Sequence, residues 1–102
     1  MGRKLKPVHP GEILREEFMA PLGLSMNRIA MDLRVPVTRI AEIVNKRRSI
    51  TADTALRLAR YFKNSAAFWM NLQSRYDLEV AEDEIAKKVE RDVRPLETPA
   101  AR

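Results

Sequence analysis

The chain has 102 residues, enough for one small domain with a single modest core. Hydrophobic residues make up 45% of it and charged residues 32%, which excludes a chain that is disordered throughout. No apolar run is long enough for a membrane span, no secretory signal follows the basic N-terminus, and the lack of cysteine excludes disulfides and thiolate metal sites. We therefore expect a cytoplasmic protein.

The net charge of +5 is distributed unevenly along the chain. Residues 1–75 contain 14 Lys and Arg and 6 Asp and Glu, whereas residues 76–102 contain 5 and 8. Five of the cations lie between Arg34 and Arg48. A basic body with an acidic C-terminal part is typical of a protein that binds a polyanion and presents its tail to another partner. The alternative is a solvated surface with some charge imbalance.

Residues 1–9 are basic and lack an apolar period, so we expect them to form a flexible arm. A first helix is expected over Pro10–Ala20, because proline suits the first helical turn. Pro21 disfavours continuation of that helix, and Gly23 permits the turn that follows.

The stretch 25–46 predicts two short helices joined by a tight turn. Ser25 is a good N-cap for the first helix, because its hydroxyl can accept a hydrogen bond from an unpaired backbone N–H. Pro36 suits the start of the second helix, and Ile40 and Ile43 give that helix an inward stripe. The residues that are expected to point away from this inward stripe are Thr38, Arg39, Glu42, Asn45 and Lys46. This layout is typical of a helix-turn-helix unit, in which the first helix rests on DNA phosphates and the second enters the major groove.

A fourth helix is expected from Thr51, a second favourable N-cap, and Asn64 is expected to adopt the left-handed conformation at its end. Ser65 caps a predicted fifth helix. The large side chains of that helix are Phe68, Trp69, Leu72 and Tyr76. Five short helices enclose little interior, so we expect Trp69 or Tyr76 to be partly exposed as a dimer contact.

A sixth helix is expected over 79–94, after a domain that spans 10–78. Its residues Ala81, Ile85, Val89 and Val93 recur every four positions and form a narrow apolar seam. Such a narrow apolar seam does not stabilise an isolated helix. The helix must therefore pack against the rest of its own chain or against another chain. We expect a homodimer whose interface contains Trp69, Leu72, Tyr76, Ile85 and Val89. Residues 95–102 are expected to be disordered.

Catalytic chemistry has little support in the sequence. The only histidine, His9, precedes a proline at a helix start, where a side chain more often caps the helix or is solvated than catalyses. No serine has a histidine in its own helix to act as its base, and the carboxylates are scattered or paired with cations. We find no metal or phosphate motif, and we expect neither enzymatic activity nor a cofactor.

The second helix of the 25–46 unit has the chemistry that DNA recognition needs. The hydroxyl and methyl of Thr38 suit a base edge or a thymine methyl, Arg39 suits guanine or a phosphate, and Glu42 suits cytosine. The cations that follow, up to Arg48, supply affinity and its salt dependence.

Three segments resemble a known family. HPGEILREEF (9–18), VPVTRIAEIVNKRRSITADTALRLARYF (35–62) and FWMNLQSRYDL (68–78) are similar to the HigA-type antitoxins of bacterial toxin–antitoxin modules, which are Cro/C1-type (XRE) helix-turn-helix proteins. The resemblance implies an all-α fold, with a compact five-helix, lambda repressor-like domain and an additional C-terminal helix. It also implies a dimer that binds a palindromic DNA operator, represses its own operon and neutralises a HigB-type toxin, an mRNA-cleaving ribonuclease.

The resemblance also implies roles for individual positions. The base-reading positions are Pro36, Val37, Thr38, Arg39 and Glu42. The positions that bind the DNA backbone are Met26, Asn27, Arg28, Asn45, Lys46, Arg47 and Arg48. Three residues depart from the family pattern: Met26 replaces a glutamine that braces a phosphate, and Arg34 and Lys46 replace glycines. The turn at Arg34 must therefore carry strain or adopt another geometry.

The sequence leaves two questions open. The toxin surface is either the acidic segment 77–84, since a toxin that grips RNA is expected to be basic, or the N-terminal arm with the first helix. The chain can also be a stand-alone transcriptional regulator of the same fold without a toxin, or a protein–protein inhibitor that has lost its affinity for DNA.

Overall fold

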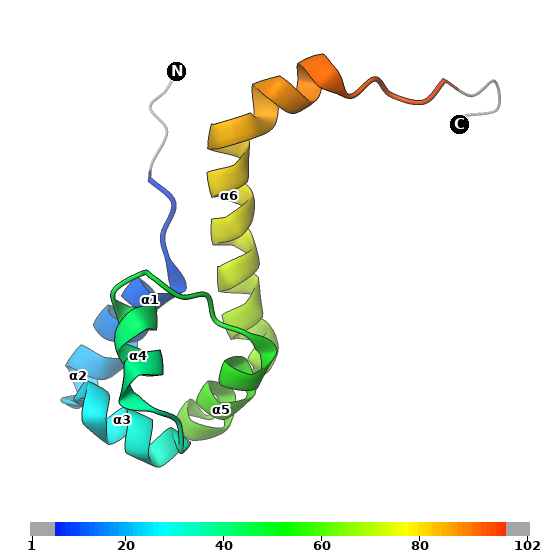
Figure 1. Ribbon diagram of the computed structural model, residues 1–102. Coiled ribbons are helices and arrows are strands. Elements are labelled where there is room, and N and C mark those ends of the chain that lie inside the picture. Colours follow the sequence, from blue (N-terminus) through cyan, green and yellow to red (C-terminus); the bar gives the residue numbers. More distant parts are fainter. Residues whose placement is uncertain (1–5, 98–102) are drawn as a thin grey trace.

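The computed structural model describes residues 6–97, which form helices joined by short loops (Figure 1). In chain order the elements are α1 Pro10–Ile13, η1 Leu14–Met19, α2 Ala20–Leu22, α3 Met26–Leu33, α4 Val37–Val44, α5 Ala52–Phe62 and α6 Ala66–Asp92. Figure 1 shows α1 to α5 and the first turns of α6 gathered into a body, from which the rest of α6 projects. The expected all-α fold is confirmed. Residues 1–5 of the predicted arm and residues 98–102 of the predicted tail lie outside the described residues.

The first three elements form one helical run, because α1, η1 and α2 follow each other without a break. The turns of η1 are wider than α-helical ones, and the Ala20 N–H binds the carbonyl of Arg15, five residues back. The run passes through Pro21 and stops before Gly23, which has φ 64°. The run therefore ends at Leu22, two residues beyond the approximate end expected at Ala20. The wide turns displace the carbonyls against which a proline ring clashes in a regular α-helix.

The start of this helical run lies directly against α4. A Cβ atom on Gly11 would lie 1.8 Å from the carbonyl oxygen of Ile43, so only glycine permits this approach. His9 is the N-cap, and its Nδ1 accepts a hydrogen bond from the Gly11 N–H at 2.9 Å. His9 is buried and packs edge-on against the ring of Tyr76 in α6, at 4.8 Å between ring centroids. It belongs to the body and not to the arm, because its capping bond and its ring contact hold it between α1 and α6.

The free energy of unfolding is expected to decrease when His9 is protonated. Burial, assisted by the charge of Lys46, lowers the pKa of His9 below its ordinary value of 6.5. The unfolded chain therefore binds a proton at higher pH than the folded chain, and stability is lost as the pH falls through about 6.5. Urea unfolding at about pH 7.5 and about pH 5.5 measures this loss. His9→Asn keeps an N-cap that does not titrate, so the variant should lose much less; an equal loss would contradict the role of His9.

The core lies where the inner faces of the helices meet the loop that precedes α5. Its most deeply buried hydrophobic side chains are Leu14, Ile29, Ile40, Ile43, Ile50, Ala55, Leu58 and Trp69. Trp69 is 0% exposed, and its ring lies 5.0 Å from both Phe18 and Phe68 between centroids. The expectation that Trp69 contacts a second subunit is therefore wrong. α6 packs along α5 and brings the indole over the first helical run, where it fills the interior that five short helices were expected to lack.

Polar side chains tie the loops to the base of α6. Gln73 is 4% exposed; it accepts a hydrogen bond from the Ile50 N–H at 2.7 Å and donates one to Asp77 at 2.9 Å. It therefore fixes the end of the loop between α4 and α5. Thr51 occupies the expected N-cap of α5, although its side chain makes no capping hydrogen bond in the described structure.

The expected left-handed conformation of Asn64 is wrong. The left-handed residue at the end of α5 is the preceding Lys63, with φ 60°. The Asn64 side chain instead accepts a hydrogen bond from the indole Nε1 of Trp69 at 3.0 Å. Burial of the tryptophan requires a partner for its N–H, and this tertiary contact determines the role of Asn64.

The two C-terminal helices expected from the sequence are one helix. α6 runs from Ala66 to Asp92, so the expected boundary between residues 78 and 79 is wrong. No glycine or proline interrupts this stretch, and Ser65 caps it as expected, with its Oγ accepting a hydrogen bond from the Phe68 N–H at 3.0 Å. Beyond the body, the apolar side chains of α6 remain on the surface, among them Leu78 at 60% exposed.

Candidate nucleic-acid interface

The turn between α3 and α4 has the backbone geometry of a helix-turn-helix unit. The Oγ of Ser25 accepts a hydrogen bond from the Arg28 N–H at 3.0 Å, which confirms the predicted N-cap of α3. Arg34 ends α3 in the left-handed region, with φ 62°. The turn thus keeps the left-handed conformation that glycine would adopt, and an arginine there carries strain of the order of 1 kcal/mol. Of the two alternatives left open for this turn, the structure selects strain.

α4 presents one face to the core and another to the surface. Ile40 and Ile43 are fully buried, as their spacing predicted. Pro36 is the N-cap, and Val37, at 41% exposed, and Thr38 stand clear of the core at the start of the helix. The predicted base-reading flank of α4 is therefore accessible from solvent.

The two charged base-reading residues are already paired within the protein. The Nη1 of Arg39 lies 3.1 Å from the Oδ1 of Asp53, and the Nε of Arg48 lies 2.8 Å from the Oε1 of Glu42. The side chain of Arg39 is 27% exposed and that of Glu42 is 43% exposed. The sequence does not reveal the contact between Arg39 and Asp53, because the two residues are 14 positions apart.

The predicted backbone-binding residues lie at the start of α3 and in the loop after α4. Met26, at 37% exposed, and Asn27 begin α3 on the surface, and Arg28 pairs with Asp32 at 2.8 Å. Figure 1 shows α3 beside α4, and the loop after α4 crossing the body toward α5. That loop carries the second group, Asn45, Lys46, Arg47 and Arg48, all of them exposed.

Lys46 takes the left-handed conformation, with φ 66°, at the position where the family usually has glycine. Its Nζ lies 3.5 Å from the Oε1 of Glu12 in α1, so the residue links the loop to the first helix. The exit from α4 is therefore kept without glycine, at the cost of backbone strain.

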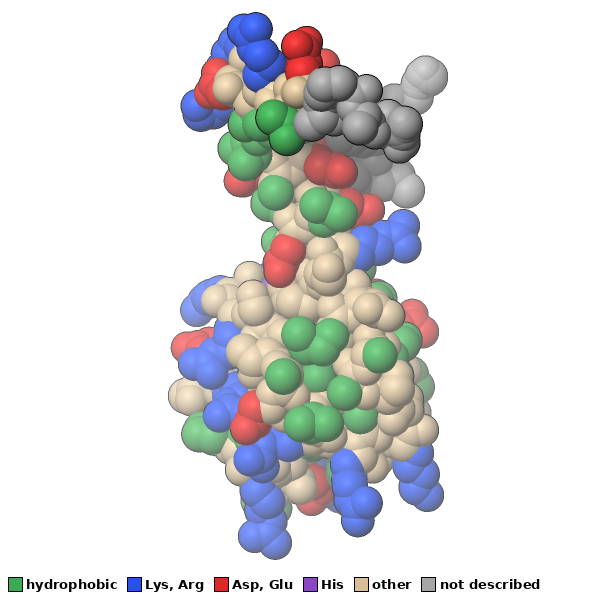
Figure 2. Space-filling view, turned by 90° about the vertical axis from the view of Figure 1, so that its right-hand side faces the viewer, with side chains coloured by type: hydrophobic (Ala, Val, Ile, Leu, Met, Phe, Trp, Pro, Cys, Tyr) green, Lys and Arg blue, Asp and Glu red, His purple; other side chains and the backbone are tan. Residues whose placement is uncertain are grey.

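Lys and Arg side chains gather on the body, as Figure 2 shows along its lower end and one of its sides. The projecting part of α6 has a different surface, with hydrophobic and acidic side chains along its length and cations near its end. The uneven charge along the sequence therefore corresponds to two regions of the structure. The body is basic, and the projecting part of α6 carries acidic side chains.

Hydrogen bonds through Asp53 and Arg57 connect α3, α4 and α5. The carboxylate oxygen Oδ1 of Asp53 also accepts a bond from the Nε of Arg57 at 2.7 Å, and the Nη1 of Arg57 donates to the carbonyl of Leu33 at 2.9 Å. The hydrogen bond from Arg57, together with the charges of Arg57 and Arg39, holds the pKa of Asp53 below its usual value. Asp53 therefore stays ionised near neutral pH.

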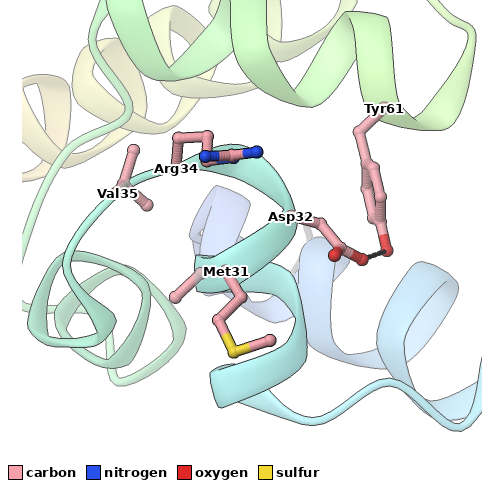
Figure 3. A pocket seen from close by; sticks show the side chains of 6 residues that line it. Met31, Asp32, Arg34, Val35 and Tyr61 are labelled. Atoms are coloured by element: carbon pink, nitrogen blue, oxygen red, sulfur yellow. Dashed lines mark hydrogen bonds between the residues drawn. The ribbon is translucent and has the colours of Figure 1, made fainter.

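A shallow hollow lies beside the inter-helix turn, lined by Ala30, Met31, Asp32, Arg34, Val35 and Tyr61 (Figure 3). Within it, the hydroxyl of Tyr61 donates a hydrogen bond to the Oδ2 of Asp32 at 2.5 Å. This bond, with that from Arg28, lowers the pKa of Asp32. The contact braces α5 against α3 and pairs Asp32 with Tyr61 across the hollow.

The remaining residues predicted for the dimer interface fall into two groups. Leu72 and Tyr76 are half-buried on the side of α6 that faces the body, where Tyr76 meets His9. Ile85 and Val89, at 47% and 44% exposed, lie on the projecting part of α6. The structure therefore does not bring the five predicted residues together on one surface.

A helix-turn-helix family model matches residues 14–69, more than half of the chain, including α3, α4 and α5. The chain belongs to the helix-turn-helix family. Within this family it is similar to the Pseudomonas aeruginosa antitoxin HigA, solved with the higBA promoter, with 46% identity and a TM-score of 0.86 over 89% of this chain and 99% of that one. The resemblance to HigA-type antitoxins is therefore confirmed.

Two further relatives of this helix-turn-helix protein are a virulence-associated protein and a transcriptional regulator. Virulence-associated protein I of Dichelobacter nodosus is 53% identical over 79% of this chain and 75% of its own length. An HTH-type transcriptional regulator of Haemophilus influenzae is 44% identical over 72% of this chain and 68% of its own length. The similarity thus extends to proteins described as regulators as well as to antitoxins.

Between residues 6 and 97, no group of three or more His, Asp or Glu side chains is placed to hold a metal ion. None of the helices in that range combines the length and the apolar character that a membrane crossing requires.

Proposed function

We propose that this helix-turn-helix protein is an antitoxin that binds a palindromic operator through α4, as a homodimer, and represses its own operon. The proposal is carried by the exposed start of α4, where Val37 and Thr38 stand clear of the core while the cations from Lys46 to Arg48 follow in the next loop. The similarity to an antitoxin solved with promoter DNA supports it. We further propose that the protein works in the cytoplasm, because its operator would be reached there.

In this proposal α4 lies in the major groove. Thr38 and Arg39 meet base edges, and Glu42 exchanges its exposed ion pair with Arg48 for a cytosine amino group, which costs little because exposed pairs contribute little stability. Arg48, once released, joins Arg47 at the phosphates. The N-terminus of α3 adds unpaired N–H groups and the positive end of a helix dipole.

Two arginine variants distinguish base reading from phosphate binding. Arg39→Ala is expected to weaken operator binding by about 1–3 kcal/mol and to relax the base preference. Arg47→Ala is expected to weaken binding to all sequences alike and to flatten the dependence on salt, since one phosphate contact is lost. Mobility shifts at fixed salt, with the promoter DNA of the operon and with a scrambled duplex, measure both effects. Unchanged binding by both variants would overturn the proposed interface.

The homodimer forms in this proposal through the projecting part of α6. Ala81, Ile85, Ala86 and Val89 line a shallow apolar hollow there, flanked by Glu82 and Glu90. Residues 82–84, before Ile85, are all acidic, whereas residues 86–92, after it, have a net charge of +1, with Lys87, Lys88 and Arg91 against Glu90 and Asp92. Two copies of this helix in antiparallel orientation would place the acidic part of each opposite the basic part of the other. This charge complementarity favours a second copy of the chain as the occupant of the seam.

Ile85→Asp is expected to convert the dimer to a monomer, because it buries a carboxylate in the centre of the seam. Sedimentation velocity at several protein concentrations measures the change, and Glu97→Gln, beyond α6, is a control that should leave the dimer intact. A dimer that survives Ile85→Asp would place the interface elsewhere.

Neutralisation of a HigB-type toxin requires a surface that complements a basic RNA-binding protein. Two acidic surfaces compete for this role: the segment 77–84 in α6, and the first helical run, where Glu16 and Glu17 are exposed. Co-expression with a short basic reading frame immediately upstream, followed by co-purification, tests the antitoxin role. Charge reversal of Glu16 and Glu17, compared with charge reversal of Asp77 and Glu79, which lie outside the proposed dimer seam, then identifies the surface.

The alternative function is a stand-alone regulator without a toxin, which the similarity to the Haemophilus regulator favours. It predicts operator binding without a co-purifying neighbour. A toxin inhibitor that lacks DNA affinity predicts the reverse, and a footprint on the protein's own promoter separates the two.

A further inference from the structure

The side chain of Arg39 is paired with a carboxylate that has a second cationic partner, Arg57. Arg39 comes from α4, Asp53 and Arg57 from α5, and the carbonyl of Leu33 from the end of α3. Arg57 donates to Asp53 at 2.7 Å and to Leu33 at 2.9 Å, and Arg39 donates to the same Asp53 oxygen at 3.1 Å. Arg57 therefore ties the Asp53 carboxylate to the end of α3, independently of the contact that Asp53 makes with α4.

The geometry of this bond leaves Arg39 with donors to spare. Only Nη1 is engaged by Asp53, and an arginine has further N–H groups on Nε and Nη2 along another edge of the guanidinium. Two parallel donors on one edge match the O6 and N7 acceptors of guanine in the major groove. With its side chain 27% exposed, Arg39 is partly covered by the protein but remains accessible.

A preformed bond to Asp53 also restricts the alternatives open to Arg39. A free arginine on a helix surface samples many rotamers and can turn to a phosphate, which carries no sequence information. The carboxylate attracts the guanidinium and repels phosphates, so it favours the orientation that faces the bases.

We propose that Asp53 is a specificity-determining positioning residue, which aligns Arg39 on guanine within the operator. The inference rests on the proposed DNA binding through α4. Asp53 itself touches no base; it acts through Arg39, and its contribution is to sequence preference and not to overall affinity.

Selection from a randomised duplex library with the wild-type protein, Arg39→Ala, Asp53→Ala and the double variant tests the proposal. Asp92→Ala is the matched control, because Asp92 is also paired with a cation, Lys88, but lies at the far end of α6. Thermal unfolding establishes that each variant is folded. Binding constants are then measured for the selected duplex and for versions with the guanine replaced.

The wild-type preference for guanine at one position of each half-site is expected to fall about tenfold in Asp53→Ala, within the range that a bidentate arginine supplies. Affinity for duplexes that lack this guanine should be unchanged or higher, because a negative charge beside the DNA is removed. In the Arg39→Ala background, Asp53→Ala should change the preference no further. Asp92→Ala should behave as wild type.

An undiminished guanine preference in Asp53→Ala would overturn the inference while leaving the proposed function intact. So would an equal loss of affinity for every sequence, which indicates a purely structural role, or a stronger preference, which indicates that Asp53 withholds Arg39 from DNA. A wild-type protein that selects no sequence would instead overturn the proposed function.

Discussion

Gly11→Ala is expected to destabilise the protein by about 3 kcal/mol or more, or to prevent it from folding. The added Cβ would lie 1.8 Å from the carbonyl oxygen of Ile43 and 2.7 Å from its carbonyl carbon. Overpacking of a core typically costs about 1–3 kcal/mol even when side chains can adjust, and here the obstacle is the backbone of α4. α1 must therefore move away from α4, which exposes the edge of the core around Leu14.

Gly23→Ala is the matched control for this prediction. Gly23 has φ 64° and no atom within 4 Å of an added Cβ, so the substitution should cost only about 1 kcal/mol of backbone strain. Thermal unfolding of the two variants measures the difference. If Gly11→Ala is no less stable than Gly23→Ala, then α1 does not lie against α4 as described.

Trp69→Ala is expected to reduce the free energy of unfolding by about 3–5 kcal/mol, as is usual for removal of a large aromatic side chain from a core. The indole is 0% exposed and packs on Phe18, Phe62 and Phe68. Its removal leaves a cavity in the core. It also removes the indole N–H that donates a hydrogen bond to Asn64.

Trp69→Phe separates the two contributions, because it keeps a ring in the cavity and loses mainly the indole hydrogen bond, worth about 1 kcal/mol. Urea unfolding at a single protein concentration compares the variants, and sedimentation of Trp69→Phe tests the dimer independently. A Trp69→Ala protein that is as stable as wild type but monomeric would show that the tryptophan lies in an interface after all.

The helices and their starts were predictable because the signals are local. Ser25 and Ser65 each accept a hydrogen bond from the N–H three residues on, so the capping bond forms within one turn of chain. Ile40 and Ile43 follow the helical period and are buried accordingly. The exposed start of α4 follows from the same periodicity, since a helix with one apolar stripe must present its other residues to solvent.

The expectations that failed concern partners distant in the sequence. Asn64 was assigned a backbone role from its local preference, but the indole of Trp69 determines its conformation. The expected break between residues 78 and 79 is absent, because the helix continues through it from Ala66 to Asp92.

The sequence by itself thus determined the order of the helices, their caps and the polar flank of α4, because these depend on residues within a turn or two of each other. Only the tertiary structure decided that Trp69 is interior, that Gly11 touches the backbone of α4 and that Asp53 holds Arg39. Each of those facts depends on how the helices cross, and the crossing is set by the packing of the whole core at once.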